Sequence, residues 1–240
     1  MKTDYQKINT LFLRDEHNII MPDHFTSPVF EQLQSCKWEC TEKIDGTNIH
    51  IDVIAEDENN INIKFCGRTE KADIPKHLLA KLQSIFTEDN IRQAFNLETG
   101  VASDGISIYG EGYGMKIQKG GNYISNDVGF ILFDVKVGRW WLNRQTCESL
   151  AEKLGVPIVP LMGYMTIDEA INFVKQGFKS TIAENKDYDA EGLVLKTPEG
   201  LLFRNGERII TKLKTCDFRK YKAKYGDGPV EQKVNPKYNS

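Results

Sequence analysis

Residues 42–53 read EKIDGTNIHIDV, and this stretch indicates the architecture of the segment around it. Asp45-Gly46 is a dipeptide typical of tight turns, because glycine adopts the backbone angles that such turns require. Over residues 49–53 that follow, apolar and polar residues alternate. This period of two predicts a strand that buries one face.

Working outward, the same alternation predicts a strand at residues 61–65 that pairs with 49–53 as a hairpin, and further strands at 106–109 and 130–137. Apolar spacing predicts helices over 76–97, 143–154 and 168–176. Asn143 is placed to cap the start of the second of these helices, and Gly155 to cap its end. The segment 190–213 reads as two or three strands joined by turns.

Hairpins interleaved with a few helices favour an α+β fold, with antiparallel sheets flanked by helices. Strands and helices do not alternate regularly, which argues against a parallel, doubly wound sheet. No internal repeat or long linker interrupts the 240 residues, so we expect one compact unit or two closely joined lobes.

Composition excludes several classes of protein. No apolar run reaches the ~18 residues of a membrane span, and acidic residues interrupt the N-terminal segment, so it is a poor secretory signal. The five cysteines form no CxxC pair, which favours reduced thiols and a cytoplasmic protein, in the host cytoplasm if the source is viral. A net charge of −3 argues against a surface that binds nucleic acid over its whole area.

A basic stretch near the C-terminus departs from this average. Residues 204–224 carry eight basic and two acidic side chains, a net charge of +6. The stretch is either a solvated basic surface or a phosphate-binding one. The basic residues are Arg204, Arg208, Lys212, Lys214, Arg219, Lys220, Lys222 and Lys224.

Lys43 lies directly before the predicted turn, where its amine could attack a phosphorus atom. A lysine attacks only when neutral, and with an ordinary pKa of about 10.4 its deprotonation at neutral pH costs roughly 4 kcal/mol. A site that uses a lysine nucleophile therefore needs burial, other cations or a metal ion beside it. A plain turn with an exposed lysine is the alternative.

Two kinds of side chain could supply that environment. Lys212 and Lys214 are two residues apart, so in a strand both ammonium groups point to one face and would suit a triphosphate. Glu111 and Glu191 each precede a glycine, and such carboxylates suit Mg²⁺ or Mn²⁺. The glycines at 110, 112 and 114 do not match a dinucleotide-binding loop, because position 115 is Met.

Two further residues complete the candidate site. Arg68, in Gly-Arg-Thr after the 61–65 strand, could hold a phosphate with two hydrogen bonds. Phe133, in the run ILFDV, could stack on a base, although an aromatic residue in such a run more often belongs to the core.

In order, EKIDGTN, GRT, YGEGYG, ILFDV, AEGLVLK and ITKLK resemble motifs I, Ia, III, IIIa, IV and V of covalent nucleotidyltransferases, the superfamily of DNA ligases, RNA ligases and mRNA capping enzymes. Gly-Thr-Asn at the end of the first motif is most similar to the RNA ligase 2 and RNA-editing ligase family. The resemblance spans about residues 40–220. Asp45 departs from that family's usual residue but is common in the superfamily.

The resemblance implies an adenylyltransferase domain over residues 1–220, with ATP bound in the cleft between its sheets. Residues 221–240 read as a polar C-terminal tail, and the composition of 226–240 predicts that this part is disordered. Lys43 would form lysyl-AMP, with Lys212 and Lys214 as the other catalytic residues. Glu111 and Glu191 would position the ribose and Mg²⁺. The remaining nucleotide-binding roles would fall to Glu42 at the adenine amino group, Ile44, Asn48 at the sugar and phosphate, Arg68 at the ribose or RNA end, and Phe133 stacked on adenine.

The implied reaction is ATP-dependent RNA ligation for RNA repair, in which AMP passes to a 5′-phosphate that a 3′-hydroxyl then attacks. The implied partner is RNA with those two ends, a nicked duplex included. Only 26 residues follow Lys214, fewer than a full C-terminal domain needs, so a protein partner could supply one. The alternatives are a GTP-dependent capping guanylyltransferase and a catalytically silent RNA-binding module.

Overall fold

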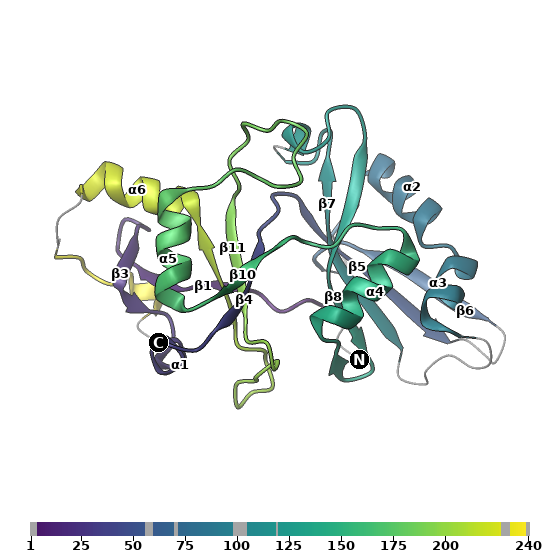
Figure 1. Cartoon of the computed structure of the whole chain (residues 1–240), viewed down its shortest axis with the longest axis horizontal. Coiled ribbons are helices and arrows are strands. Elements are labelled where there is room, and N and C mark those ends of the chain that lie inside the picture. Colours follow the sequence, from purple (N-terminus) through teal and green to yellow (C-terminus); the bar gives the residue numbers. More distant parts are fainter. Residues whose placement is uncertain are drawn as a thin grey trace. The chain divides into compact units, whose positions relative to one another are not determined.

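The computed structural model describes residues 4–55, 60–69, 72–97, 105–118, 120–226 and 231–238 (Figure 1). The chain divides into two compact units. Unit 1 comprises the N-terminal residues to Gln6, Ile44–Val159 and Ile182–Asn185, and unit 2 comprises Lys7–Lys43, Pro160–Thr181 and Lys186–Ser240. Within the described ranges, no helix is both long and apolar enough to cross a membrane.

Unit 1 is built on a five-stranded antiparallel sheet in the order β6-β5-β7-β8-β9. Its strands are β5 (Thr47–Ala55), β6 (Ile61–Cys66), β7 (Ile106–Gly114), β8 (Val128–Val137) and β9 (Trp140–Trp141). The predicted hairpin is confirmed, because Ile51 of β5 pairs with Phe65 of β6. The remaining elements are α2 (Lys76–Ile85), α3 (Glu88–Phe95), α4 (Arg144–Leu154) and the short η1 (Gly120–Asn122).

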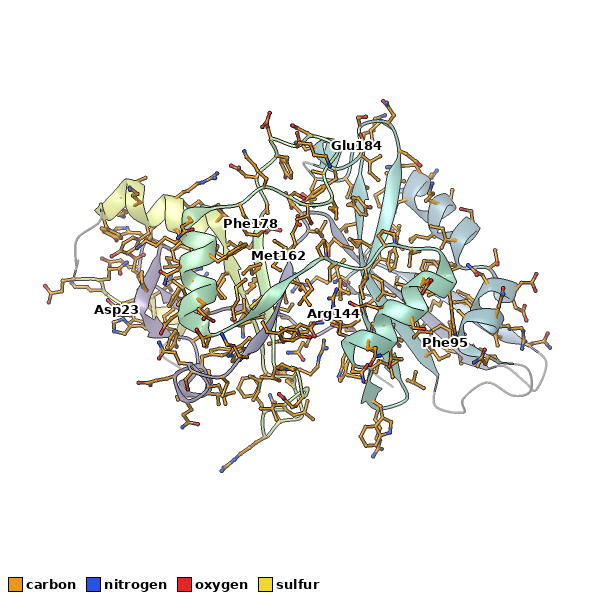
Figure 2. All side chains as sticks on the ribbon, in the orientation of Figure 1. Asp23, Phe95, Arg144, Met162, Phe178 and Glu184 are labelled. Atoms are coloured by element: carbon orange, nitrogen blue, oxygen red, sulfur yellow. The ribbon has the colours of Figure 1, made fainter. Side chains whose placement is uncertain are left out.

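The alternation in β5 decides which face of this sheet is the core. Ile49, Ile51 and Val53 are fully buried in one apolar cluster with residues of α2, α3 and α4, and Phe95 packs against its edge (Figure 2). His50 and Asp52 lie on the opposite face and are also buried. Both faces of β5 are therefore buried, whereas the alternation predicted that only one face would be.

The predicted helix over 76–97 is wrong in one respect, because it consists of two helices. Thr87 accepts a hydrogen bond from the backbone of Asn90 and so caps the start of α3, while buried Phe86 packs edge-on against Phe130. In contrast, α4 has the predicted ends. Asn143 accepts a hydrogen bond from the backbone of Thr146, and Gly155 follows in the left-handed conformation.

Unit 2 has a five-stranded sheet in the order β1-β12-β11-β4-β10 and a separate two-stranded sheet, β2-β3. The pairs are antiparallel except for β1 with β12, which is parallel. The strands are β1 (Asn9–Thr10), β2 (Phe12–Arg14), β3 (Ile20–Phe25), β4 (Trp38–Glu42), β10 (Leu161–Met165), β11 (Gly192–Lys196) and β12 (Ile210–Lys214).

The helices of unit 2 are α1 (Pro28–Gln32), α5 (Ile167–Gln176), α6 (Thr215–Tyr225) and the short η2 (Pro236–Tyr238). The apolar cluster of unit 2 includes Leu193 and Leu213 of the sheet and Val174 of α5, with Met162 and Phe178 packed against it (Figure 2). A capping box starts α5, in which Thr166 and Glu169 exchange hydrogen bonds. The α+β fold with antiparallel sheets is thus confirmed.

The expectation of a disordered segment over residues 226–240 is wrong for residues 231–238. The preceding residues 221–225 continue α6, and Tyr225 donates a hydrogen bond to Asp15. Farther along the chain, the backbone N–H of Glu16 donates to the carbonyl of Lys233, and that of Asn235 donates to the carbonyl of Arg14. Residues 233–235 therefore lie beside the end of β2. Residues 227–230 and 239–240 of the predicted tail lie outside the described residues.

Candidate active site

Three strand ends in unit 2 bring together the lysines and one acid of the candidate site. In the sheet, β11 lies between β4 and β12. Gly192 pairs with Lys214 on one side, and on the other its carbonyl accepts a hydrogen bond from the backbone of Lys43 at 2.9 Å. Glu191 directly precedes Gly192, so its carboxylate lies within reach of both lysines.

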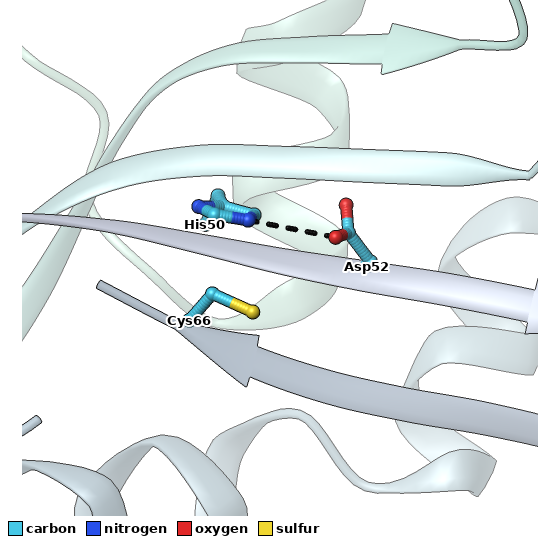
Figure 3. Close-up of side chains that lie close together, drawn as sticks. All are labelled: His50, Asp52 and Cys66. Atoms are coloured by element: carbon cyan, nitrogen blue, oxygen red, sulfur yellow. Dashed lines mark ion pairs between the residues drawn. The ribbon is translucent and has the colours of Figure 1, made fainter. Parts of the chain in front are cut away.

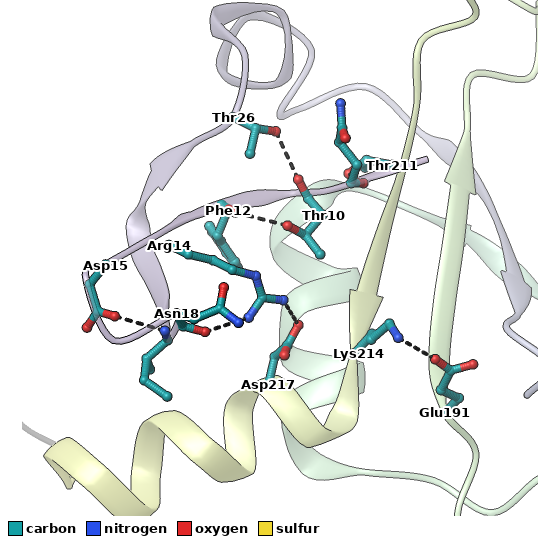
Figure 4. A network of polar contacts seen from close by, with 12 residues as sticks. Thr10, Phe12, Arg14, Asp15, Asn18, Thr26, Glu191, Thr211, Lys214 and Asp217 are labelled. Atoms are coloured by element: carbon teal, nitrogen blue, oxygen red, sulfur yellow. Dashed lines mark hydrogen bonds and ion pairs between the residues drawn. The ribbon is translucent and has the colours of Figure 1, made fainter. Parts of the chain in front are cut away.

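Glu191 holds both ammonium groups at once. Lys43 Nζ lies 2.5 Å from Glu191 Oε2, and Lys214 Nζ lies 2.6 Å from Oε1 (Figure 4 draws the second pair). The side chains of Glu191, Lys43 and Lys214 are 15%, 21% and 29% exposed, so all three are largely shielded from water. Two positive charges and one negative charge leave this cluster with a net charge of +1.

The pKa values of the cluster reflect these contacts. Burial alone would raise the pKa of the Glu191 carboxyl, but the charge of Lys43 and the hydrogen bonds from both lysines hold it below its ordinary value. Burial would lower the pKa of Lys214, whereas the hydrogen bond and charge of Glu191 raise it. Glu191 and Lys214 are therefore both held in their charged forms.

The backbone at Gly192 explains why a glycine follows the acid. Its φ is +151°, and an added Cβ would lie 1.9 Å from the carbonyl oxygen of Leu213. No side chain fits at this distance, so glycine allows β11 and β12 to approach each other directly beside Glu191. The close approach of the β11 and β12 backbones therefore explains why a glycine follows Glu191 in the sequence.

Lys212 and Lys214 share a face of β12, as predicted. Both are half-buried, whereas Leu213 between them and Thr211 before them are buried.

The other basic residues of the stretch 204–224 do not form one surface. Arg208 is buried, against the expectation of a solvated or phosphate-binding face, whereas Arg204 and the basic residues of α6 are exposed. The basic side chains of residues 204–224 therefore lie in different environments: some are exposed, some half-buried and one buried.

Glu42 has partners that the sequence did not predict. Its carboxylate is buried, with Oε1 accepting from Ser180 Oγ at 2.5 Å and Oε2 accepting from the backbone and hydroxyl of Thr181 at 3.0 and 2.7 Å. These contacts fix residues 180–181 next to Glu42, the residue directly before Lys43. No local signal pointed to them, because 138 residues separate Ser180 from Glu42.

The other predicted site residues belong to unit 1. Asn48 and Glu111 pair across β5 and β7. Asn48 Oδ1 is buried and has no hydrogen-bond partner among the described residues, so it could accept a bond from a substrate hydroxyl or amino group. Glu111 and Phe133 are half-buried, and Tyr5 packs edge-on against Phe133 with 5.0 Å between ring centroids.

Ile44 and Arg68 contrast in exposure. The side chain of Ile44 is buried. Arg68 is exposed at the end of β6, where its guanidinium could reach a phosphate. Gly46, two residues after Ile44, packs against the backbone of β7. A Cβ at this position would lie 2.3 Å from the carbonyl oxygen of Gly112, so only glycine fits there.

The carboxylate oxygens of Glu191 in unit 2 are hard donors of the kind that a divalent cation such as Mg²⁺ or Mn²⁺ prefers. Glu111 in unit 1 carries a carboxylate of the same kind. Both oxygens of Glu191 already meet positive groups, so a cation bound there would compete with Lys43 and Lys214 for the same oxygens.

Comparison with known proteins identifies structures with the same fold. Solved structures of the Naegleria gruberi RNA ligase share the fold. The enzyme with PPi is 20% identical with a TM-score of 0.57, covering 95% of this chain and 61% of that one. An alanine variant with ATP and Mn is 18% identical with a TM-score of 0.59, covering 92% and 60%.

This chain therefore spans about three-fifths of the length of those ligases. The RNA ligase family model matches residues 37–214, a range that begins before Lys43 and ends at Lys214. The chain belongs to the RNA ligase family.

Proposed function

We propose that this protein is an ATP-dependent RNA ligase in which Lys43 is the nucleophile. The proposal rests chiefly on the cluster of Lys43, Glu191 and Lys214. Its net charge of +1, with half-buried Lys212 on the same strand, suits the phosphates of ATP. The Naegleria gruberi structures with ATP, AMP and Mn support a nucleotide and a divalent ion as its ligands.

In the first step, Lys43 Nζ attacks the α-phosphorus of ATP. A nitrogen–phosphorus bond forms, the bond from the α-phosphorus to the bridging oxygen breaks, and pyrophosphate leaves. The attacking amine must first lose a proton and leave its ion pair with Glu191. A bound Mg²⁺ or Mn²⁺ would supply positive charge against the phosphates, with Glu191 and Glu111 as its ligands.

Other side chains would bind the rest of the nucleotide. Lys212 and Lys214 would hold phosphates, Phe133 would stack on adenine, and Asn48 would bind the sugar through its buried oxygen. Arg68 would contact the ribose or the RNA end. Glu42 would contact the adenine amino group. Ile44 would contact the nucleotide through its backbone.

The later steps would join RNA ends. AMP passes from Lys43 to a 5′-phosphate, and a 3′-hydroxyl then displaces AMP to close the strand. Residues 1–220 would form the adenylyltransferase domain for these steps.

Labelling the protein with α-³²P-ATP tests the first step. We expect a labelled band after denaturation that depends on Mg²⁺ or Mn²⁺ and falls at least about 100-fold in Lys43→Ala. Lys37→Ala is a matched control, because Lys37 is exposed and pairs with Glu169 on the surface. Label from GTP alone would favour a guanylyltransferase. A folded protein that takes no label would favour a silent RNA-binding module.

Pre-adenylylated RNA separates the later steps from the first. This substrate already carries AMP, so Lys43→Ala should seal it to a 3′-hydroxyl while failing with ATP and 5′-phosphate RNA. If the wild-type protein labels itself but seals neither substrate, the proposed adenylylation stands. The proposal that this chain alone ligates RNA is then wrong.

A further inference from the structure

A second group of titratable side chains lies in unit 1 and has no role in the proposed ligation. His50 and Asp52 are two residues apart on β5, so both point to the same face of the sheet (Figure 3). Cys66 is the direct partner of His50 on the neighbouring β6. One ligand atom from each residue lies within 4.8 Å of the other two.

All three side chains are buried. His50 is 0% exposed, and Asp52 and Cys66 are each 3% exposed. Polar groups at such depth need partners, since burial removes their hydrogen bonds to water. Cys66 forms no disulfide with any of the other cysteines, all of which lie in the described ranges.

His50 lacks those partners. Neither Nδ1 nor Nε2 makes a hydrogen bond to any described residue, and a neutral imidazole carries one donor and one acceptor that burial leaves unsatisfied. Asp52 Oδ2 lies 3.5 Å from Nε2, too far for a good hydrogen bond. This distance suits two ligands of one metal ion, because atoms about 2.1 Å from a tetrahedral centre lie about 3.4 Å apart.

The three donors match one kind of ion. An imidazole nitrogen, a thiolate and a carboxylate oxygen together suit Zn²⁺, whereas Mg²⁺ and Ca²⁺ bind oxygen alone. A thiolate and a carboxylate carry two negative charges, which balance one divalent ion in a buried position. The carboxylate is also oriented, since Ser107 Oγ donates to Asp52 Oδ1 at 2.7 Å and leaves Oδ2 facing His50.

We propose that His50, Asp52 and Cys66 bind one zinc ion that ties β5 to β6. This zinc site differs in chemistry from the carboxylate ligands proposed for Mg²⁺ or Mn²⁺, and it does not depend on the ligase proposal. Three protein ligands leave one position of a tetrahedral ion for a further donor. The competing explanation is a metal-independent ion pair between protonated His50 and Asp52.

Metal content of the full chain tests this proposal without reference to activity. The protein would be stripped with a chelator, reloaded with ZnCl₂ in the presence of excess MgCl₂, desalted and analysed by elemental mass spectrometry. We expect about one zinc ion per chain. Cys66→Ser and His50→Gln should each lower the content at least about tenfold. Cys147→Ser is the matched control, because Cys147 is buried on α4 away from the cluster and should keep the metal.

Cobalt loading identifies the ligand atoms. Co²⁺ in place of zinc should give a thiolate-to-cobalt charge-transfer band in the near ultraviolet, present in Cys147→Ser and absent in Cys66→Ser. Asp52→Asn keeps the side-chain shape and guards against a variant that fails to fold. It should retain the native circular dichroism spectrum while losing zinc.

Two results would overturn the proposal. Folded wild-type protein that holds less than about one-tenth of an equivalent after reloading would leave the ion pair as the explanation. Equal zinc content and equal cobalt spectra in the wild type and in the His50, Asp52 and Cys66 variants would show adventitious binding elsewhere.

Discussion

Lys43 and Lys214 hold opposite oxygens of one carboxylate, with Nζ atoms 2.5 and 2.6 Å from Glu191 Oε2 and Oε1. Lys43 directly follows β4 and Lys214 ends β12, the two strands that flank β11. The carboxylate therefore separates two like charges in a largely buried place. This arrangement makes Glu191 important for folding as well as for any chemistry, and the two roles can be measured separately.

Replacing Glu191 by Gln should destabilise the protein. The substitution keeps the shape but leaves two ammonium groups facing a neutral amide, and we expect a loss of about 2 kcal/mol in the free energy of unfolding. Urea unfolding measures this loss. Glu199→Gln is the control, because Glu199 is exposed and should change stability by less than about 0.5 kcal/mol. Equal stability of the two variants would contradict a structural role for the ion pairs.

The same cluster predicts a dependence of stability on pH. Because the folded pKa of Glu191 is lowered, its contribution is present above the ordinary pKa of about 4.3 and is lost as pH falls through the folded value. The raised pKa of Lys214 contributes below about 10.4 and is lost as pH rises through the folded value. Urea unfolding from about pH 3 to 11 should show the stability gap between wild type and Glu191→Gln shrinking at both ends. A gap constant with pH would contradict this assignment.

Gly192→Ala should be strongly destabilising. The added Cβ would lie 1.9 Å from the Leu213 carbonyl oxygen, so β11 and β12 would have to separate, at a cost of about 3 kcal/mol or more. Gly121→Ala is the matched control, since a Cβ there has no atom within 4 Å. Thermal unfolding of both variants checks the prediction, and equal melting temperatures would refute it.

Thr181→Val should loosen the segment that holds Glu42. Valine keeps the branched shape but removes the hydroxyl that donates to Glu42 Oε2 at 2.7 Å, and a hydrogen bond to a buried charge contributes about 1.5–3 kcal/mol. The measurements are urea unfolding and proteolysis near residues 180–181. Thr146→Val, at an exposed position of α4, should have little effect on either. A stable Thr181→Val protein would mean that Ser180 and the backbone N–H of residue 181 satisfy the carboxylate without the hydroxyl.

Thiol reactivity should separate the cysteines by burial. Burial raises the pKa of the Cys40 thiol to about 12, so it stays protonated and unreactive at pH 8, whereas Cys36 and Cys216 are exposed. Alkylation of native protein followed by peptide mass spectrometry should modify Cys36 and Cys216 within minutes and Cys40 only after unfolding. Rapid modification of Cys40 would show that β4 opens under native conditions.

The sequence determined features that depend on neighbours in the chain. Asn143, Gly155 and Thr166 mark helix ends because a cap bonds to backbone groups within one turn. The alternation over residues 49–53 and the spacing of Lys212 and Lys214 likewise fix strand faces, since successive side chains of a strand point to opposite sides. The order of the motifs also sufficed to identify the family.

The tertiary structure decided which distant groups meet. Glu191 joins Lys43 across 148 residues because β11 lies beside β4 in the sheet of unit 2. Glu42 meets Thr181, in the segment between α5 and β11, across 139 residues. Likewise, His50 lies beside Cys66 only because β5 and β6 pair in that register. Local sequence sets the direction of each side chain, but contacts between strands depend on sheet order and register, which arise when the whole core packs.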